Sequence, residues 1–225
     1  MNFHEHFLSR TFDAVLFDMD GTILTSIKAT ERVWGAWGLK HGLDLDAFLP
    51  TIHGVRAIDT IRKLNLPGVD ADVEAAEIMR AEIEDTDGIE QIAGAADFLA
   101  SLPTDRWAVV TSAPRALAER RIAAAGLPTP PQMITAEDVE KGKPQPDCFL
   151  TAARRLGADP ARCLVFEDAP AGITAAETAG CVVVVISATH RHPLATHHIQ
   201  IADYNGFQVS SERSSGIRLE RKPAD

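Results

Sequence analysis

Cysteine is scarce in this sequence, and the number and spacing of the cysteines indicate the cellular compartment. The 225 residues include three cysteines, Cys148, Cys163 and Cys181, and no two of them form a Cys-x-x-Cys pair. An odd number of thiols without such spacing indicates reduced side chains, as in cytosolic proteins. We therefore expect a cytoplasmic protein.

Positive charge is also in short supply. The chain has 22 Lys and Arg against 32 Asp and Glu, which gives a formal net charge of −10. Nucleic acids and anionic membranes require a basic surface, so we expect neither as a partner. A small phosphate ester needs only local positive charge and is therefore not excluded.

Long hydrophobic runs are missing as well. The longest apolar run, residues 181–186, is far too short to span a bilayer. The first ten residues, MNFHEHFLSR, contain no apolar segment of the kind found in signal peptides, so we expect no signal peptide. The acidic surplus, together with the lack of an exposed apolar run, favours a monomer.

The sequence does contain an alternation of strand-like and helix-like segments. Hydrophobic residues make up 45% of the chain, enough for a sizeable core. Short apolar runs predict buried strands at residues 12–17, 107–110, 163–166 and 182–186. Helical patterns separate the last three predicted strands, at residues 114–125, 146–156 and 170–179. This order predicts an α/β fold with a mainly parallel sheet covered by helices on both faces.

The segment between the first two predicted strands is different, because it contains no convincing strand. It reads as helices at residues 29–41, 55–64 and 73–85, with a turn at residues 43–46. Such a block, spliced into a parallel sheet, is a candidate second domain above the first strand. We predict a discontinuous core of residues 1–24 and 89–210 and a helical domain of residues 25–88. Residues 211–225 are polar and predict a frayed or edge-strand tail.

Two carboxylates, Asp18 and Asp20, directly follow the first predicted strand. Met19 separates them, and Gly21 and Thr22 come next. The carboxyl edge of an open α/β sheet is where ligands bind, and clustered negative charge there favours a hard cation such as Mg²⁺. One carboxylate can attack an electrophile while the other transfers a proton. The alternative is a solvated turn that closes a strand.

Polar residues also follow the other predicted strands. Thr111 and Ser112 precede a helix whose free N–H groups suit an anion, although either residue can simply cap that helix. Lys143 lies in a proline-stiffened loop and offers a point charge for phosphate oxygens, although a solvated turn is the alternative. Glu167 and Asp168 would complete a Mg²⁺ site, or Asp168 caps the following helix.

Taken together, these residues resemble a known family. The pattern Asp18-x-Asp-Gly-Thr22, with Ser112, Lys143 and Glu167-Asp168, resembles the four signature motifs of the haloacid dehalogenase-like hydrolases. Residues 141–147 and 166–181 are similar to the branch that contains β-phosphoglucomutases and sugar phosphatases. Residues 107–115 and 53–56 most resemble the 2-deoxyglucose-6-phosphate and glycerol-phosphate phosphatases.

The resemblance implies a Rossmann-like three-layer core with a small all-α cap of the C1 type inserted after the first motif. It implies that Asp18 is the nucleophile, which forms an aspartyl-phosphate, and that Asp20 is the general acid and base. It also implies a Mg²⁺ cofactor held by Asp18, the backbone carbonyl of Asp20 and Asp168, with Glu167 nearby or bridged by water.

The resemblance further implies which residues meet the substrate. Lys143 and Ser112 would bind the transferring phosphoryl group, and the expected phosphate-binding set is Gly21, Thr22, Thr111, Ser112, Ala113 and Lys143. In the cap, His53, Gly54 and Arg56 match a substrate-specificity loop of the family. The alternative is that His53 and Gly54 form a turn that leads into a helix and that Arg56 is a surface cation.

The expected activity is hydrolysis of a small sugar or polyol phosphate. A phosphosugar mutase of the β-phosphoglucomutase type is the first alternative, but such mutases usually have Val or Ile where this chain has Thr22. A non-catalytic sugar-phosphate-binding protein is the second alternative, although every motif residue is present. A further cluster of His190, His192, His197 and His198 could bind a transition metal, but a polar loop is the simpler interpretation.

Overall fold

A computed structural model describes residues 10–190, 192–212 and 216–222 of the chain. Its central feature is a six-stranded sheet whose paired strands all run parallel, in the order β5-β4-β1-β6-β7-β8. The strands are β1 (Ala14–Phe17), β4 (Trp107–Val110), β5 (Met133–Ile134), β6 (Cys163–Glu167), β7 (Val182–Ile186) and β8 (Ile199–Ile201). Strand β1 therefore lies in the middle, between β4 and β6.

Strand β1 is buried on both faces, which explains its continuous apolar sequence. Its register pairs Phe17 with Val109 of β4 and with Phe166 of β6. Since the three strands are parallel, the residues that follow them emerge at the same edge of the sheet. The carboxylates and hydroxyls that the sequence suggested for catalysis and phosphate binding stand at these positions.

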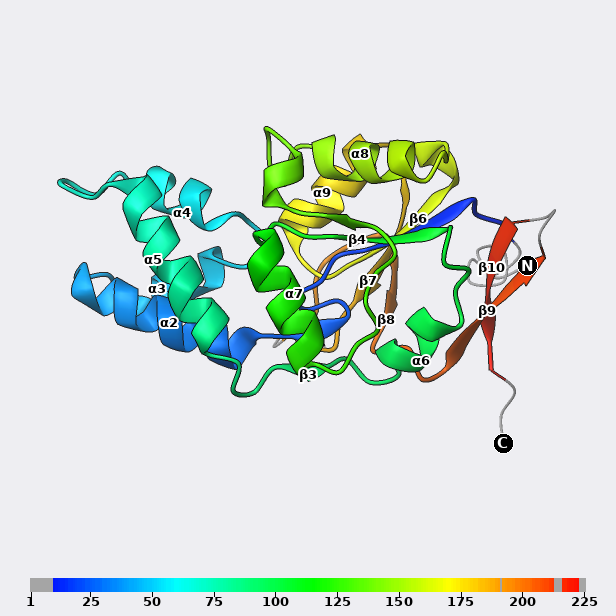
Figure 1. Ribbon diagram of the computed structural model, residues 1–225, viewed down its shortest axis with the longest axis horizontal. Helices are drawn as coiled ribbons and strands as arrows, with labels where there is room; N and C mark the ends of the chain where they lie inside the picture. Colours follow the sequence, from blue (N-terminus) through cyan, green and yellow to red (C-terminus); the bar gives the residue numbers. More distant parts are fainter. Residues whose placement is uncertain (1–9, 191, 213–215, 223–225) are drawn as a thin grey trace.

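Helices cover both faces of the sheet, as the alternation of strands and helices predicted (Figure 1). Helices α6 (Ala95–Ala100) and α7 (Arg115–Ala124) pack on one face, in a core that includes Phe98 and Leu117. Helices α8 (Asp147–Arg155) and α9 (Pro170–Thr178) pack on the other face, in a core that includes Phe149 and Ile173. The prediction of a three-layer α/β core is confirmed.

A helical insertion, residues 26–89, separates β1 from β4 in the sequence and lies to one side of the sheet in Figure 1. It consists of α2 (Ile27–Lys40), α3 (Leu45–Phe48), α4 (Ala57–Leu64) and α5 (Ala71–Glu84), with a 3₁₀ turn, η1, at Leu49–Thr51. Its own apolar core contains Trp34, Trp37, Phe48, Ile52, Ile61 and Ile78. The insertion is therefore stabilised by contacts separate from those of the sheet.

The two connections to the insertion lie side by side. Strand β2 (Leu24–Thr25) leads into it and pairs antiparallel with β3 (Glu90–Gln91), which leads out. These four paired residues join the insertion to the core as a short two-stranded ribbon. The predicted boundaries of the helical domain, at residues 24–25 and 88–89, lie in or directly beside this ribbon. The division into two domains stays a proposal.

The C-terminal segment, predicted as a frayed or edge-strand tail, contains two strands. Strands β9 (Phe207–Glu212) and β10 (Gly216–Arg221) form an antiparallel hairpin, and Phe12 pairs with Ile217. Ile217 and Leu219 are buried in the same core as α6 and α7, because they alternate along β10 and face inward. This segment is thus part of the core; residues 213–215 and 223–225 of the predicted tail lie outside the described residues.

Other differences from the predictions are local. The predicted turn at residues 43–46 is the start of α3, where the Asp44 side chain accepts a hydrogen bond from the Asp46 N–H. Short 3₁₀ turns occur at η2 (Ala136–Asp138) and η3 (Pro160–Arg162). The N-terminal segment in which we expected no signal peptide falls mostly in residues 1–9, outside the described residues. Within the described part of the chain, no helix has the length and apolar character needed to cross a membrane.

Candidate active site

Carboxylates from two adjacent strand ends meet at the carboxyl edge of the sheet. Asp18 directly follows β1, Glu167 is the last residue of β6, and Asp168 follows it. One oxygen from each of these three side chains lies within 4.8 Å of the other two. Three hard oxygen donors in one place are the ligand set that Mg²⁺ prefers, so the residues fit the expected cation.

Lys143 is the positive charge nearest to these carboxylates. Its Nζ donates to Asp18 Oδ1 at 2.5 Å, to Glu167 Oε1 at 2.8 Å and to the carbonyl of Val110 at 3.2 Å. The side chain is 1% exposed, although it comes from the loop before α8. The loop therefore delivers a buried ammonium to the edge where β1, β4 and β6 end.

The electrostatics of this cluster show a surplus of negative charge. Burial raises the pKa of Asp18 to about 8, with Glu167 and Asp20 adding to the effect and Lys143 opposing it. Burial and the neighbouring Glu167 and Asp18 also raise the pKa of Asp168 well above its usual range. For Lys143, burial alone would lower the pKa, but Asp18 and Glu167 outweigh it and the net shift is upward. One ammonium does not neutralise the cluster, and a bound divalent cation would.

Glu167 also organises the loop that follows it. Its Oε2 accepts hydrogen bonds from the backbone N–H groups of Asp168 and Ala169, both at 2.7 Å. A β-carbon on Gly172 would lie 1.5 Å from Glu167 Oε1, so only glycine leaves room for this carboxylate. Similarly, a β-carbon on Gly21 would lie 2.0 Å from Asp168 Oδ2, and Gly21 has φ +90°.

Asp20 is held apart from Asp18 by a different set of partners. Its Oδ1 accepts from Ser26 Oγ at 2.5 Å, and its Oδ2 accepts from Arg121 Nη1 at 2.9 Å. Arg121 in turn donates through Nη2 to Thr30 Oγ1 and to Glu82 Oε1, both at 2.9 Å. These four residues were not singled out in the sequence, because Arg121, Thr30 and Glu82 lie within helical patterns and Ser26 lies just before one.

The expected phosphate-binding residues surround the same edge. Ala113 N–H donates to Thr111 Oγ1 at 3.0 Å, so the turn after β4 is tightly formed. Ser112 Oγ donates to the carbonyl of Gly54 in the insertion at 3.1 Å. Thr22 Oγ1 lies 3.4 Å from Asp168 Oδ1, at the limit for a hydrogen bond. The residues after β1, β4 and β6 and the Lys143 loop are therefore brought together, and their role in binding phosphate stays a prediction.

A pocket lies between this edge and the helical insertion. Its lining includes residues of the site (Asp18, Asp20, Thr111, Ser112, Ala113), residues of the insertion (Ser26, Thr30, Trp34, Ile52, His53, Gly54, Val55, Ala57, Glu82) and residues of α7 and its approach (Pro114, Leu117, Arg121). His53 and Gly54, expected at the substrate, belong to this lining. The insertion therefore forms a wall of the candidate site.

The side chain of Arg56 forms hydrogen bonds with other residues of the protein. Its Nε donates to Asp59 Oδ2 at 2.6 Å, and its Nη1 donates to the carbonyl of Glu140 at 3.0 Å. A β-carbon on Gly142 would lie 2.7 Å from Arg56 Nε, so the guanidinium lies directly against the loop that holds Lys143. In this structure Arg56 joins α4 to that loop, and the expected contact with a substrate hydroxyl or anion stays a prediction.

The histidine cluster divides into two places. His190 Nε2 lies 2.9 Å from the carbonyl of Asp168, next to the carboxylate cluster. His198 Nε2 lies 2.8 Å from Glu177 Oε1 on the surface, and His197 Nε2 lies 3.8 Å from the same oxygen. His190 therefore lies apart from His197 and His198. The latter two and Glu177 offer three ligand atoms within 4.8 Å of one another, so a transition-metal site at this surface pair stays a prediction.

Comparison with known proteins gives consistent results. The family model described as haloacid dehalogenase-like hydrolase matches residues 12–180. Hexitol phosphatase A of Escherichia coli (strain K12) is 43% identical over 178 residues, which cover 77% of this chain and 82% of that protein. Glycerol-1-phosphate phosphohydrolase 2 of Saccharomyces cerevisiae is 37% identical over 195 residues, covering 81% of this chain and 77% of that protein. The resemblance inferred from the motifs is confirmed.

A solved structure shows the same fold at lower sequence identity. The crystal structure of β-phosphoglucomutase from Clostridium difficile superposes with a TM-score of 0.69 and 21% identity, covering 78% of this chain and 84% of that chain. A likeness at this identity shows the fold alone. It does not decide between a hydrolase and a mutase.

Proposed function

The chain belongs to the haloacid dehalogenase-like hydrolases, and from this we propose that it is a Mg²⁺-dependent phosphatase of small sugar or polyol phosphates. The observation that most supports the proposal is the position of Lys143, buried between Asp18 and Glu167 at the edge where the strands end. This arrangement places a nucleophile beside a fixed positive charge. Phosphoryl transfer needs such positioning and charge neutralisation.

In the proposed first step, a carboxylate oxygen of Asp18 attacks the phosphorus atom of the ester. The P–O bond to the alcohol breaks, and Asp20 gives its proton to the departing oxygen. The product on the protein is an aspartyl-phosphate at residue 18. Lys143, with Ser112 and the backbone N–H groups after β4, would bind the transferring phosphoryl oxygens.

In the proposed second step, Asp20 takes a proton from a water molecule, which attacks the phosphorus of the aspartyl-phosphate. The bond to Asp18 breaks, inorganic phosphate leaves, and both carboxylates return to their starting forms. Asp18, Asp168 and the backbone carbonyl of Asp20 would hold Mg²⁺, with Glu167 close by. The bound cation would neutralise phosphate charge and bring the raised pKa of Asp18 down, so that it attacks as a carboxylate.

The helical insertion is proposed to select the alcohol. It contributes His53, Gly54, Trp34 and Ile52 to the pocket, so a leaving group would meet both polar and apolar surface. The relatives named above are phosphatases of a hexitol phosphate and of glycerol 1-phosphate, which supports a small polyol or sugar phosphate as the substrate. We further propose that the protein acts as a cytoplasmic monomer without nucleic acid or membrane partners.

The test is release of inorganic phosphate from a panel of hexitol, hexose, pentose and glycerol phosphates in the presence of Mg²⁺. Asp18→Asn and Asp20→Asn are the matched controls, because each removes one proposed role and preserves shape. We expect turnover by the wild type and almost none by either variant. Wild-type turnover no higher than that of the variants would favour the non-catalytic binding protein.

A mutase would be recognised by a different product. Conversion of β-glucose 1-phosphate to glucose 6-phosphate without net release of phosphate would overturn the choice of a phosphatase. Two observations count against that outcome. The chain has Thr22 where such mutases usually have Val or Ile, and the insertion is acidic over residues 70–90, which disfavours retention of a bisphosphate.

A further inference from the structure

Arg121 connects the proposed acid and base to the helical insertion. It lies on α7 of the core, and its side chain is 6% exposed. Its guanidinium contacts Asp20 after β1, Thr30 on α2 and Glu82 on α5. Residues from two parts of the chain remote from Arg121, at positions 20–30 and at position 82, thus converge on one buried cation.

The charges around Arg121 are arranged to keep it in place. Arg121 lies between two carboxylates, with Asp20 and Glu82 each 2.9 Å from a guanidinium nitrogen. Glu82 is 8% exposed and lies 2.9 Å from Arg121 Nη2, so its carboxylate has a fixed partner in the insertion. Breaking such a buried pair by removing one partner is costly, so the guanidinium has little freedom to leave.

The orientation of the Asp20 carboxyl is set from both sides. Ser26 Oγ binds one oxygen, and Arg121 Nη1 binds the other. A carboxyl group that must donate a proton to one oxygen and later take one from water works only within hydrogen-bond reach of both. The rotation of this group therefore depends on the two donors, and one of them is held by helices of the insertion.

We propose that Arg121 is a positioning residue for Asp20, and that Thr30 and Glu82 of the docked insertion hold Arg121 in its working place. The proposal rests on the function given above, since it assigns Arg121 a role through the acid and base of that reaction. It makes alignment of Asp20 dependent on packing of α2 and α5 against α7. Docking of the insertion over the pocket is thereby coupled to the alignment of Asp20 for proton transfer.

The effect of a misaligned Asp20 can be measured by comparing substrates that differ in their leaving group. An alkyl phosphate requires a proton on the departing oxygen, whereas p-nitrophenyl phosphate releases a phenolate that departs without one. Loss of Asp20 alignment should therefore lower kcat/KM for the alkyl substrate and leave the aryl substrate nearly unchanged. Because kcat/KM reports the steps up to transfer of the phosphoryl group to Asp18, the later hydrolysis does not obscure the contrast.

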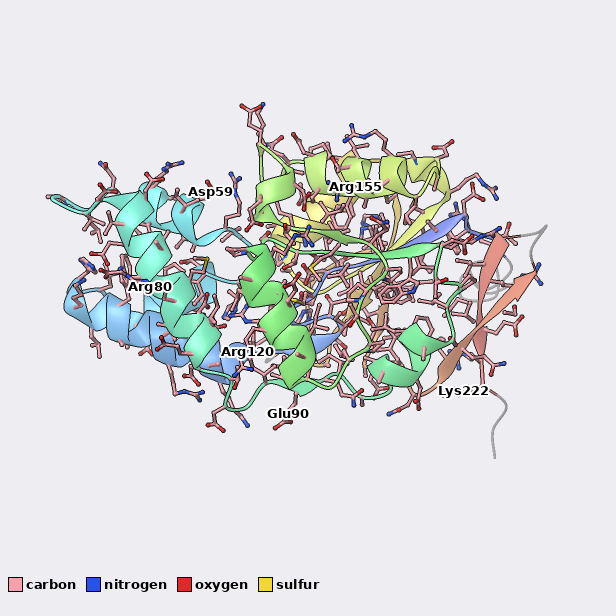
Figure 2. The ribbon with its side chains drawn as sticks, in the orientation of Figure 1. Asp59, Arg80, Glu90, Arg120, Arg155 and Lys222 are labelled. Carbon is pink, nitrogen blue, oxygen red and sulfur yellow. The ribbon has the colours of Figure 1, made fainter. Side chains whose placement is uncertain are left out.

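The experiment compares Arg121→Gln with Arg120→Gln, on the best alkyl phosphate of the panel and on p-nitrophenyl phosphate. Arg120 is the adjacent residue on α7, is exposed, and donates to the carbonyl of Ile83 on α5, so its variant controls for loosened packing of these helices (Figure 2). Since general acid catalysis contributes about 10²–10⁴-fold, we expect Arg121→Gln to lose roughly tenfold or more on the alkyl phosphate. On the aryl phosphate we expect a loss below about threefold, and Arg120→Gln should be close to wild type on both.

A double-mutant cycle tests whether Arg121 acts through Asp20. If it does, adding Arg121→Gln to Asp20→Asn causes no further loss on the alkyl phosphate. Equal losses on both substrates, no loss on either, or a full further loss in the Asp20→Asn background would each overturn the proposal. Glu82→Gln, which is nearly isosteric, provides the same substrate contrast if Arg121→Gln folds poorly. Failure of the wild type on every phosphate ester would instead overturn the proposed function.

Discussion

The hydroxyl of Tyr204 donates a hydrogen bond to the backbone carbonyl of Thr22, with a distance of 3.2 Å between the oxygens. Tyr204 is the only tyrosine of the chain and is 1% exposed, and its ring lies among Phe17, Phe98 and Phe166. The segment after β8 is thereby fixed to the loop that positions Asp18 and Asp20. The relationship joins the packing of the core to the geometry of the site.

Replacing Tyr204 by Phe should lower the free energy of unfolding by about 1 kcal/mol, since a typical buried hydrogen bond contributes about 0.5–1.5 kcal/mol. The ring and its aromatic contacts remain, so the loss reports the hydroxyl and the carbonyl of Thr22 that it leaves without this donor. Urea unfolding at constant protein concentration measures the change. A midpoint identical to that of the wild type would show that the hydrogen bond does not contribute.

Gly172 is predicted to tolerate no side chain, although it lies in a helix. A β-carbon there would collide with Glu167, which holds Lys143 and accepts the N–H groups of Asp168 and Ala169. Gly172→Ala should displace these groups and reduce Mg²⁺ affinity and activity by about 10–100-fold, as substitutions behind metal ligands typically do. Phosphate release as a function of Mg²⁺ concentration measures both effects.

Gly206→Ala is the matched control for this substitution. A β-carbon on Gly206 would meet no described residue within 4 Å, and its φ is not in the left-handed region. We expect wild-type activity and Mg²⁺ dependence from this variant. If Gly172→Ala behaved in the same way, the space around Glu167 would be less restricted than the structure indicates.

Much of the sheet could be predicted from the sequence because its central strands are buried on both faces. Such strands consist of continuous apolar residues. The runs at 12–17, 107–110 and 182–186 contain β1, β4 and β7, and the run at 163–166 contains β6 except for its last residue, Glu167. The parallel arrangement then implies that residues after these strands are neighbours. The proximity of Asp18 and Glu167 follows from that topology, whereas Lys143 reaches them from the loop before α8.

The shorter strands gave no usable pattern. Strand β5 has two residues and β8 has three, which is too few for an alternation or a continuous run to be distinguished from a loop. Strand β10 shows an alternation of Ile217 and Leu219, but the polar sequence around it indicated a frayed or edge-strand tail. These strands form only because partners elsewhere in the chain provide an edge or a face.

Arg121 and Glu82 could not be recognised from the sequence for a related reason. Each lies in a helix beside other charged residues, such as Arg120 and Glu84, and a run of charge on a helix is usually a solvated face. Their burial arises only when α5 packs against α7, and that contact is set by the docking of the whole insertion. A tertiary contact of this kind leaves no local signature.

Removal of divalent metal should abolish the proposed activity. With EDTA we expect no phosphate release, and excess Mg²⁺ should restore it. Mg²⁺ should also raise the melting temperature, since a ligand that binds only the folded state stabilises it by mass action. Asp168→Asn should weaken both effects, whereas Asp105→Asn, an exposed carboxylate away from the site, should not. Full activity in EDTA would contradict a role for the metal.

The last prediction concerns the pH dependence of stability and Asp138. This carboxylate accepts from Arg155 Nη2 at 2.6 Å, from Arg115 Nη2 at 3.0 Å, and from the N–H and hydroxyl of Thr135, both at 2.9 Å; Arg155 lies on α8 (Figure 2). Burial alone would raise the pKa of Asp138, but the hydrogen bonds from Arg155 and Thr135 outweigh it and lower the pKa from 3.8 to about 2. Because the folded pKa is below the unfolded one, the ionised group stabilises the fold above pH ~4, and the contribution is lost as the pH falls toward 2.

From this shift, Asp138→Asn should cost about 1–2 kcal/mol at pH 7, and the difference from wild type should shrink below pH ~4. Urea midpoints of both proteins between pH 7 and pH ~2.5 measure this, with Asp72→Asn, whose side chain is 75% exposed in a pair with Arg62, as a control that should change little. A difference that stays constant over the whole range would show that Asp138 stabilises the fold through its shape and not through its charge.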